Sequence, residues 1–132
     1  MLETAAVVAF LPSRDLERSE RFFHDVLGLT VRSRSPYATV FQTGQTSLRV
    51  TKVGDLDPQP FTVVGWVVAD VRAEVTLLRD RGVQFLRYEG MGQDEHDVWT
   101  TPGGDLITWF HDPDGNVLSL TQFATTTESP DT

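Results

Sequence analysis

The residues of this sequence that could carry acid–base, nucleophilic or metal chemistry are few and scattered. There are three histidines, His24, His96 and His111, and no cysteine, so disulfides, thiolate metal sites and cysteine nucleophiles are excluded. The spacing of the histidines matches no metal-binding motif. Ser119 lies outside any G-x-S-x-G sequence and has no identifiable histidine partner. These residues alone therefore predict no catalytic group.

Charged and glycine-rich segments offer weaker signals. The loop Gln93-Asp94-Glu95-His96-Asp97 could bind a cation, although a solvated loop explains the same composition. Gly103-Gly104 follows a proline inside an apparent hairpin, so we expect a turn there and no phosphate cradle. The net charge is −8. It leaves no basic stripe for nucleic acid. Its summed field favours a cationic ligand, although acidity that mainly keeps a protein soluble explains the same charge and is the commoner case.

The elements that must position these residues follow an order that repeats along the chain. The first half reads as a strand, a helix and three short strands, at 5–11, 13–27, 29–34, 38–42 and 47–52. The second half reads as a strand, a helix and further short strands, at 61–69, 70–82, 83–88, 98–101, 106–111 and 116–123. Candidate helix caps lie at matching places: Ser13 or Asp15 and Asp70 at the starts, and Gly28 and Gly82 at the ends.

This repetition indicates an internal duplication within one domain, residues 1–123. We predict two βαβββ modules, 5–53 and 61–123, joined by a linker at 54–60 and followed by a flexible tail at 124–132. The expected fold is α+β, with both modules forming a curved mixed sheet around a cavity that would hold a ligand. No apolar run approaches the ~20 residues of a membrane helix. We therefore expect a cytoplasmic protein with no membrane partner.

Three segments together resemble the vicinal oxygen chelate superfamily, which includes glyoxalase I, extradiol dioxygenases, fosfomycin-modifying transferases and bleomycin-binding resistance proteins. They are SRDLERSERFFHDVLGL in the first half, and ADVRAEVTLLRDRGV and FHDPDGNVLSL in the second. The resemblance spans roughly residues 5 to 123. It implies the glyoxalase/bleomycin resistance fold, and a homodimer.

Metal-dependent members of that superfamily hold a divalent cation on four side chains, usually His, Glu or Gln, two from each module. Carried over by position, the resemblance places these ligands at Val8, Arg49, Val64 and Ser119. Valine offers no donor atom, arginine is cationic, and a neutral hydroxyl is a poor replacement for a carboxylate. A shift of one residue at any position reaches no strong donor either. We therefore predict no metal and no other cofactor.

Alternation along the predicted strands gives the residues that would line the cavity instead. Val8 shares a face with Phe10, and Val64 shares one with Trp66. The residues expected to bind a ligand are Phe10, Arg49, Trp66, Trp99, Trp109 and Ser119. An indole offers a stacking surface and a guanidinium can bind a carboxylate or pair with a neighbouring acid. Tyr37 and Tyr88 are weaker candidates.

Three functions are compatible with these observations. The first is a metal-free small-molecule-binding protein that resembles the drug-sequestering, bleomycin-resistance-like members and holds a small aromatic or cationic compound. The second is a glyoxalase- or dioxygenase-type enzyme with a non-standard metal site. The third is a cofactor-free enzyme in which Arg49 steadies an oxyanion. The sequence identifies neither the ligand nor a catalytic residue.

Overall fold

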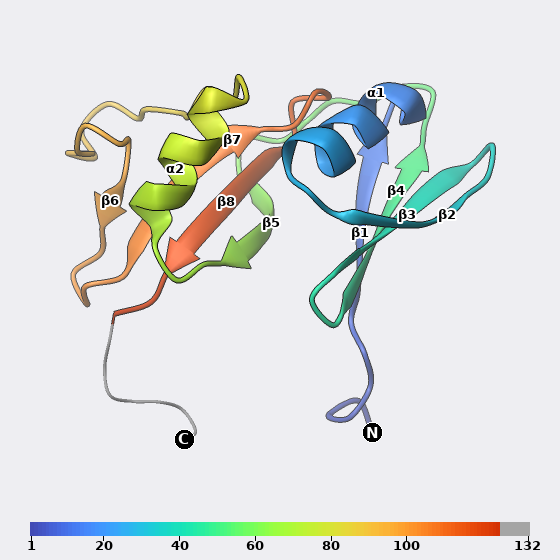
Figure 1. Cartoon of the computed structure of the whole chain (residues 1–132), viewed down its shortest axis with the longest axis horizontal. Helices are drawn as coiled ribbons and strands as arrows, with labels where there is room; N and C mark the ends of the chain where they lie inside the picture. The colour runs from blue at the N-terminus through green and yellow to red at the C-terminus, as the bar shows by residue number, and fades with distance from the viewer. Residues whose placement is uncertain (125–132) are drawn as a thin grey trace. The chain divides into compact units, whose positions relative to one another are not determined.

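The computed structural model describes residues 1–124 and divides the chain into two compact units (Figure 1). Among the described residues, unit 1 comprises Met1–Val63 together with Asp112–Val117, and unit 2 comprises Val64–His111 and residues 118–124. Of the tail expected at 124–132, all but its first residue lies outside the described part. No helix among the described residues is long and apolar enough to cross a membrane.

Unit 1 contains the βαβββ order that the sequence predicts. Its elements are β1 (Val8–Ser13), α1 (Leu16–Glu20), the π-helix η1 (Arg21–Val26), β2 (Thr30–Arg34), β3 (Ala38–Thr43) and β4 (Thr46–Lys52). The strands form a mixed sheet in the order β1-β4-β3-β2, in which β1 runs parallel to β4. Asp15 caps α1, since its carboxylate accepts the Arg18 N–H at 3.1 Å.

One face of the first sheet packs into the core of unit 1. Leu11, Leu48 and Phe41 alternate with more exposed neighbours on β1, β4 and β3, and each is at most 1% exposed. The Phe23 ring of η1 contacts Phe41 with centroids 5.5 Å apart. Because this face buries its apolar residues against the helical segment, the residues between them point to the opposite face, called here the open face of the first sheet.

Unit 2 repeats the same topology. Its elements are β5 (Thr62–Val67), α2 (Val71–Asp80), β6 (Trp99–Thr100), β7 (Leu106–His111) and β8 (Val117–Gln122), with β5 and β8 beginning inside unit 1. The strand order is β5-β8-β7-β6, which corresponds strand for strand to β1-β4-β3-β2. Asp70 caps α2 by accepting the Ala73 N–H at 3.1 Å. The duplicated α+β fold predicted from the sequence is confirmed.

The extended segment predicted at 83–88 is not a strand of the second sheet. It makes one isolated bridge, between Phe85 and Phe110, and the Leu86 N–H donates to the Trp109 carbonyl at 2.8 Å. β6 pairs with the beginning of β7, and the segment 83–88 lies along the same edge of β7 further on, beside Trp109 and Phe110. A single bridge is too short to define a strand, although the hydrogen bond to Trp109 fixes the backbone of the segment.

The turn 112–116 belongs to unit 1, although the sequence assigned it to the second module. Asp114 is fully buried, and its carboxylate accepts the Arg14 N–H at 2.9 Å and the Arg18 Nη2 at 2.7 Å. Asn116 Nδ2 donates to the Pro12 carbonyl at 3.1 Å. These bonds tie the turn to β1 and α1, across about a hundred residues of sequence.

Candidate ligand-binding surfaces

The open face of the first sheet carries Arg49 between two apolar residues. Strand register pairs Arg49 of β4 with Phe10 of β1 on one side and with Val40 of β3 on the other. Phe10 is 63% exposed, whereas Arg49 is half-buried. The sequence prediction that Val8 and Phe10 share the face of Arg49 is consistent with this register, because Val8 pairs with Ser47 two residues before Arg49.

Within unit 2, three aromatic side chains contact one another. The rings of Trp99 and Trp109 are stacked with centroids 6.2 Å apart and planes inclined by 29°. Tyr88 meets Trp109 edge to face at 5.4 Å. We call Tyr88, Trp99 and Trp109 the aromatic cluster. Its rings are half-buried or partly exposed, so they offer a surface on which a planar compound can stack.

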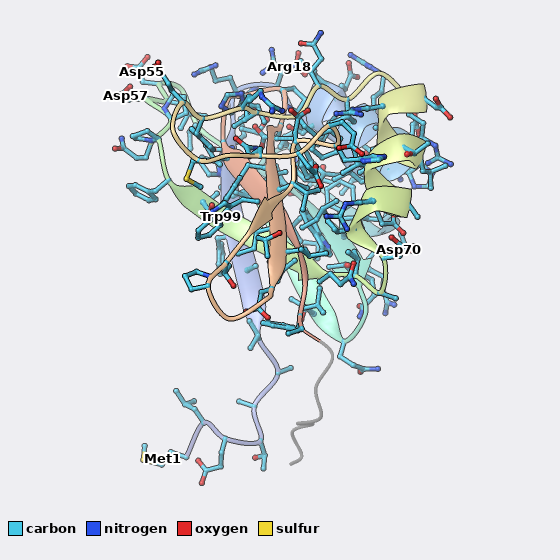
Figure 2. The ribbon with its side chains drawn as sticks, turned by 90° about the vertical axis from the view of Figure 1, so that its left-hand side faces the viewer. Met1, Arg18, Asp55, Asp57, Asp70 and Trp99 are labelled. Carbon is cyan, nitrogen blue, oxygen red and sulfur yellow. The ribbon has the colours of Figure 1, made fainter. Side chains whose placement is uncertain are left out.

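The aromatic cluster lies on the face of the second sheet away from α2. Thr108 and Phe110 are fully buried on one face of β7, so alternation places Ile107 and Trp109 on the other. Trp99 pairs with Ile107 and shares that face. In Figure 2 Trp99 lies on the opposite side of the strands from α2, whose cap Asp70 is also labelled. The cluster is therefore separate from the core under the helix.

A hydrogen-bonded loop fixes the ends of this cluster. The buried amide of Gln93 accepts the Tyr88 N–H at 2.7 Å and donates to the Leu86 and Asp97 carbonyls. Arg87 Nη2 donates to the Gln93 carbonyl at 2.6 Å, and Arg87 also pairs with the Asp97 carboxylate. Since Tyr88 precedes this loop and Trp99 follows it, the loop holds two of the three rings in place.

Within the described residues, the Asp94 carboxylate of this loop forms hydrogen bonds that hold the loop together. Burial alone would raise the pKa of Asp94, but the N–H groups of Val98 and His96 and the Arg72 guanidinium outweigh burial, and its pKa is lowered. Asp94, Glu95 and His96 bring three candidate metal-ligand atoms within 4.8 Å of one another. One oxygen of Asp94 is bound by Arg72 at 2.9 Å and the other accepts two N–H groups. This cluster therefore supports no metal assignment.

Ser119 lies against Gly65, and not against Trp66. A Cβ added to Gly65 would stand 2.3 Å from the Ser119 Oγ, so both residues face the same side of the second sheet. Alternation then sends the Trp66 side chain to the other side. The Asp112 N–H donates to the Asn116 carbonyl, so these two residues are opposite each other where β7 meets β8. Three residues further along each of these antiparallel strands, Trp109 lies opposite Ser119. The sequence counted both Trp66 and Ser119 among the residues lining one cavity, whereas their side chains lie on opposite faces of the second sheet.

Replacing Gly65 by alanine is expected to destabilise the protein by roughly 1–3 kcal/mol, the usual range for overpacking. The cause is the contact between the new methyl group and the Ser119 Oγ. Urea denaturation of the single variants and of Gly65→Ala with Ser119→Gly would measure the coupling between the positions. We expect the second change to recover about 1 kcal/mol or more. Strictly additive effects would contradict the contact.

Comparisons with known proteins agree with this topology. Residues 5–120 match the model of the Glyoxalase/Bleomycin resistance protein/Dioxygenase superfamily. The chain belongs to this superfamily. No curated protein matches the sequence significantly.

Solved structures of the superfamily's fold resemble the chain over nearly its whole length. TnmS3, an antibiotic binding protein from Streptomyces sp. CB03234, is 24% identical with a TM-score of 0.68, over 92% of this chain and 98% of that one. Lactoylglutathione lyase from Agrobacterium tumefaciens is 18% identical with a TM-score of 0.72, over 92% and 96%. A glyoxalase/bleomycin resistance protein/dioxygenase from Alicyclobacillus acidocaldarius is 17% identical with a TM-score of 0.69, over 92% and 93%. At these identities the likeness shows the fold.

The side chains at the positions where the superfamily holds its metal do not fit a cation. Arg49 stands in register between Phe10 and Val40, and the Ser119 hydroxyl lies 2.3 Å from where a Cβ on Gly65 would stand. Val8 carries no donor atom, and neither does Val64 nor Val63, which takes the place of Val64 when the register of β5 is corrected. The adjoining residues on the same faces, Phe10 and Gly65, add none. The side chains at these positions thus offer a positive charge in unit 1 and one neutral hydroxyl in unit 2, neither of which suits a divalent cation, so no step of chemistry is derived through a metal.

Of the six residues that the sequence proposed for binding, the structure groups four in two places. Phe10 and Arg49 are adjacent in unit 1, and Trp99 and Trp109 stack in unit 2. Ser119 lies on the face of Trp109, whereas Trp66 does not. Tyr88, ranked lower from sequence, joins the cluster because the Gln93 loop brings it against Trp109. Whether any of these residues contacts a ligand stays a prediction.

Proposed function

We propose that this member of the superfamily is a metal-free protein that binds a small planar aromatic compound reversibly. The observation that carries the proposal is the aromatic cluster, in which Trp99 and Trp109 stack on a face that the core does not use. Aromatic rings exposed together on a rigid support provide a binding surface at low entropic cost. The Gln93 loop supplies that support.

Two further observations favour binding over catalysis. The positions that the resemblance assigns to metal ligands, Val8, Arg49, Val64 and Ser119, lack the donors of a Lewis-acid centre, and replacing Val64 by Val63 in the corrected register adds none. The similarity to TnmS3, whose solved structure is that of an antibiotic binding protein, offers a precedent for binding on this fold. The role of such binding would be sequestration of the compound, which is what the resemblance to the drug-sequestering members implies. We also propose, from the resemblance alone, that the protein forms a homodimer.

Metal analysis tests the metal-free part of this proposal. The protein would be expressed in metal-supplemented medium and purified without chelators or a histidine tag. We expect far less than one divalent metal ion per chain, because the donor set does not fit one. One equivalent of tightly bound metal would contradict the proposal and direct attention to His96 and His111, which the four positions leave out.

Tryptophan fluorescence tests the binding part. The chain has three tryptophans, and a planar compound that stacks on Trp99 or Trp109 is expected to quench their emission in a saturable way. A panel of naphthalene derivatives provides suitable probes. Absence of saturable quenching, together with absence of heat in calorimetric titrations of the same panel, would overturn the proposal.

A further inference from the structure

We infer that the open face of the first sheet, within unit 1, has an anion-binding site at which Arg49 takes the carboxylate or phenolate of an aromatic acid. The inference goes beyond the proposed function, because it concerns residues of unit 1 and not the aromatic cluster of unit 2. It departs from the sequence-based expectation that a cationic compound would be preferred.

Arg49 is surrounded on its face by side chains without acidic groups. Its register partners are Phe10 and Val40, and the residues two positions away on β4 are Ser47 and Thr51. Among the described residues, no hydrogen bond or ion pair is formed by the Arg49 guanidinium. Its five N–H donors are therefore available to an acceptor that the described part of the chain does not provide.

The other half-buried arginines, unlike Arg49, pair with acidic side chains. Arg18 pairs with Asp114 at 2.7 Å, and Arg72 pairs with Asp94 at 2.8 Å. In the described part of the chain, Arg49 is the one half-buried basic residue without an acidic partner. A partly desolvated cation without an acceptor is unfavourable, and an anion bound there offsets that cost.

The neighbours of Arg49 suit the organic part of an aromatic acid. Phe10, directly beside it and 63% exposed, offers a ring against which a carbon skeleton can lie. The guanidinium is planar and binds a carboxylate through two parallel N–H groups. A cationic ligand would be repelled at the same contact distance. The overall charge of −8 acts over longer distances, where salt screens it.

The test compares three naphthalene compounds of similar shape, 2-naphthoate, 2-naphthylmethanol and 2-naphthylmethylammonium, by calorimetric titration. We expect wild-type protein to bind naphthoate about 10- to 100-fold more tightly than the alcohol, the range for a hydrogen-bonded charged group, and to bind the ammonium compound most weakly. Arg49→Met is expected to bind naphthoate and the alcohol with equal affinity, and Arg49→Lys to retain part of the preference.

Arg32→Met is the matched control, because it removes the same charge from an exposed residue of β2 in the same unit. It should leave the preference for naphthoate unchanged. If wild-type protein binds the alcohol as tightly as naphthoate, or if Arg49→Met keeps the preference, the inference is overturned while the proposed binding function stands. If no compound of the three binds at millimolar concentration, both are overturned.

Discussion

Replacing Trp109 by leucine is expected to weaken binding of a planar aromatic compound by about 10- to 100-fold, the loss typical of a central aromatic contact. Trp109 contacts both other members of the cluster, with ring centroids 6.2 Å from Trp99 and 5.4 Å from Tyr88. Its removal takes away one stacking surface and loosens the other two. Calorimetric titration with 2-naphthol would measure the change in affinity.

Trp66→Leu is the comparison for this variant. Both changes replace an indole by an aliphatic side chain within unit 2, but the Trp66 side chain lies on the opposite side of the sheet from Ser119 and the aromatic cluster. We expect its effect on affinity to stay within about threefold, well below a central contact. An equal loss in both variants would show that the cluster is not the binding surface, or that the indoles act through stability alone.

Replacing Asp114 by alanine is expected to lower the free energy of unfolding by about 3 kcal/mol, the lower end for breaking a buried ion pair. The carboxylate is fully buried and accepts bonds from Arg14 N, Arg18 Nη2 and Ser19 Oγ. Arg18 is 39% exposed and can turn to water, which limits the loss. The Arg14 N–H and the buried Ser19 hydroxyl lose an acceptor.

Urea denaturation followed by far-UV circular dichroism would measure this effect. Asp55→Ala is the control, because Asp55 is an exposed acid of the same unit; both Asp55 and Arg18 are labelled in Figure 2. It should change stability by less than about 0.5 kcal/mol, as surface substitutions usually do. A loss of similar size in both variants would indicate that Asp114 acts only through the net charge of the protein.

Local rules predicted the framework of the fold well. Asp15 and Asp70 cap the two helices as expected, and Gly28 and Gly82 adopt positive φ just after them. These features depend on a few neighbouring residues, and the sequence contains all of them. The second strand order repeats the first, which the repeated order of elements along the chain indicated. The position of the turn at Asp114 is different, since it depends on α1, about a hundred residues away.

The error at Trp66 comes from a single residue of register. The structure places Phe10 beside Arg49 and Gly65 beside Ser119, and both lie five residues before their helix caps, 15 − 10 and 70 − 65. The sequence interpretation counted seven residues back to Val8 but six back to Val64. Because side chains alternate between the two faces of a strand, residues five and seven positions before the cap lie on one face, and a residue six positions before it lies on the other. Val64 and Trp66 were therefore assigned to the wrong face.

Two properties of the candidate surfaces, one in each unit, depend on contacts distant in sequence. Tyr88 reaches Trp109 because the buried amide of Gln93 holds the backbone of the loop, and no pattern of residue types predicts that bond. Arg49 has no acidic neighbour on its face of the first sheet, because the pairing of β4 with β1 and β3 places Phe10 and Val40 beside it. Residue types indicated that both could bind a ligand, and the register shows what surrounds them.

The central claim is that binding is reversible and independent of metal. It is tested most directly by one calorimetric titration of 2-naphthoate, performed on protein before and after exhaustive treatment with a chelator, with the compound recovered at the end. We predict the same affinity in both samples and unchanged compound. Loss of binding after chelation, or recovery of a chemically altered compound, would contradict the claim and favour an enzyme of the same superfamily.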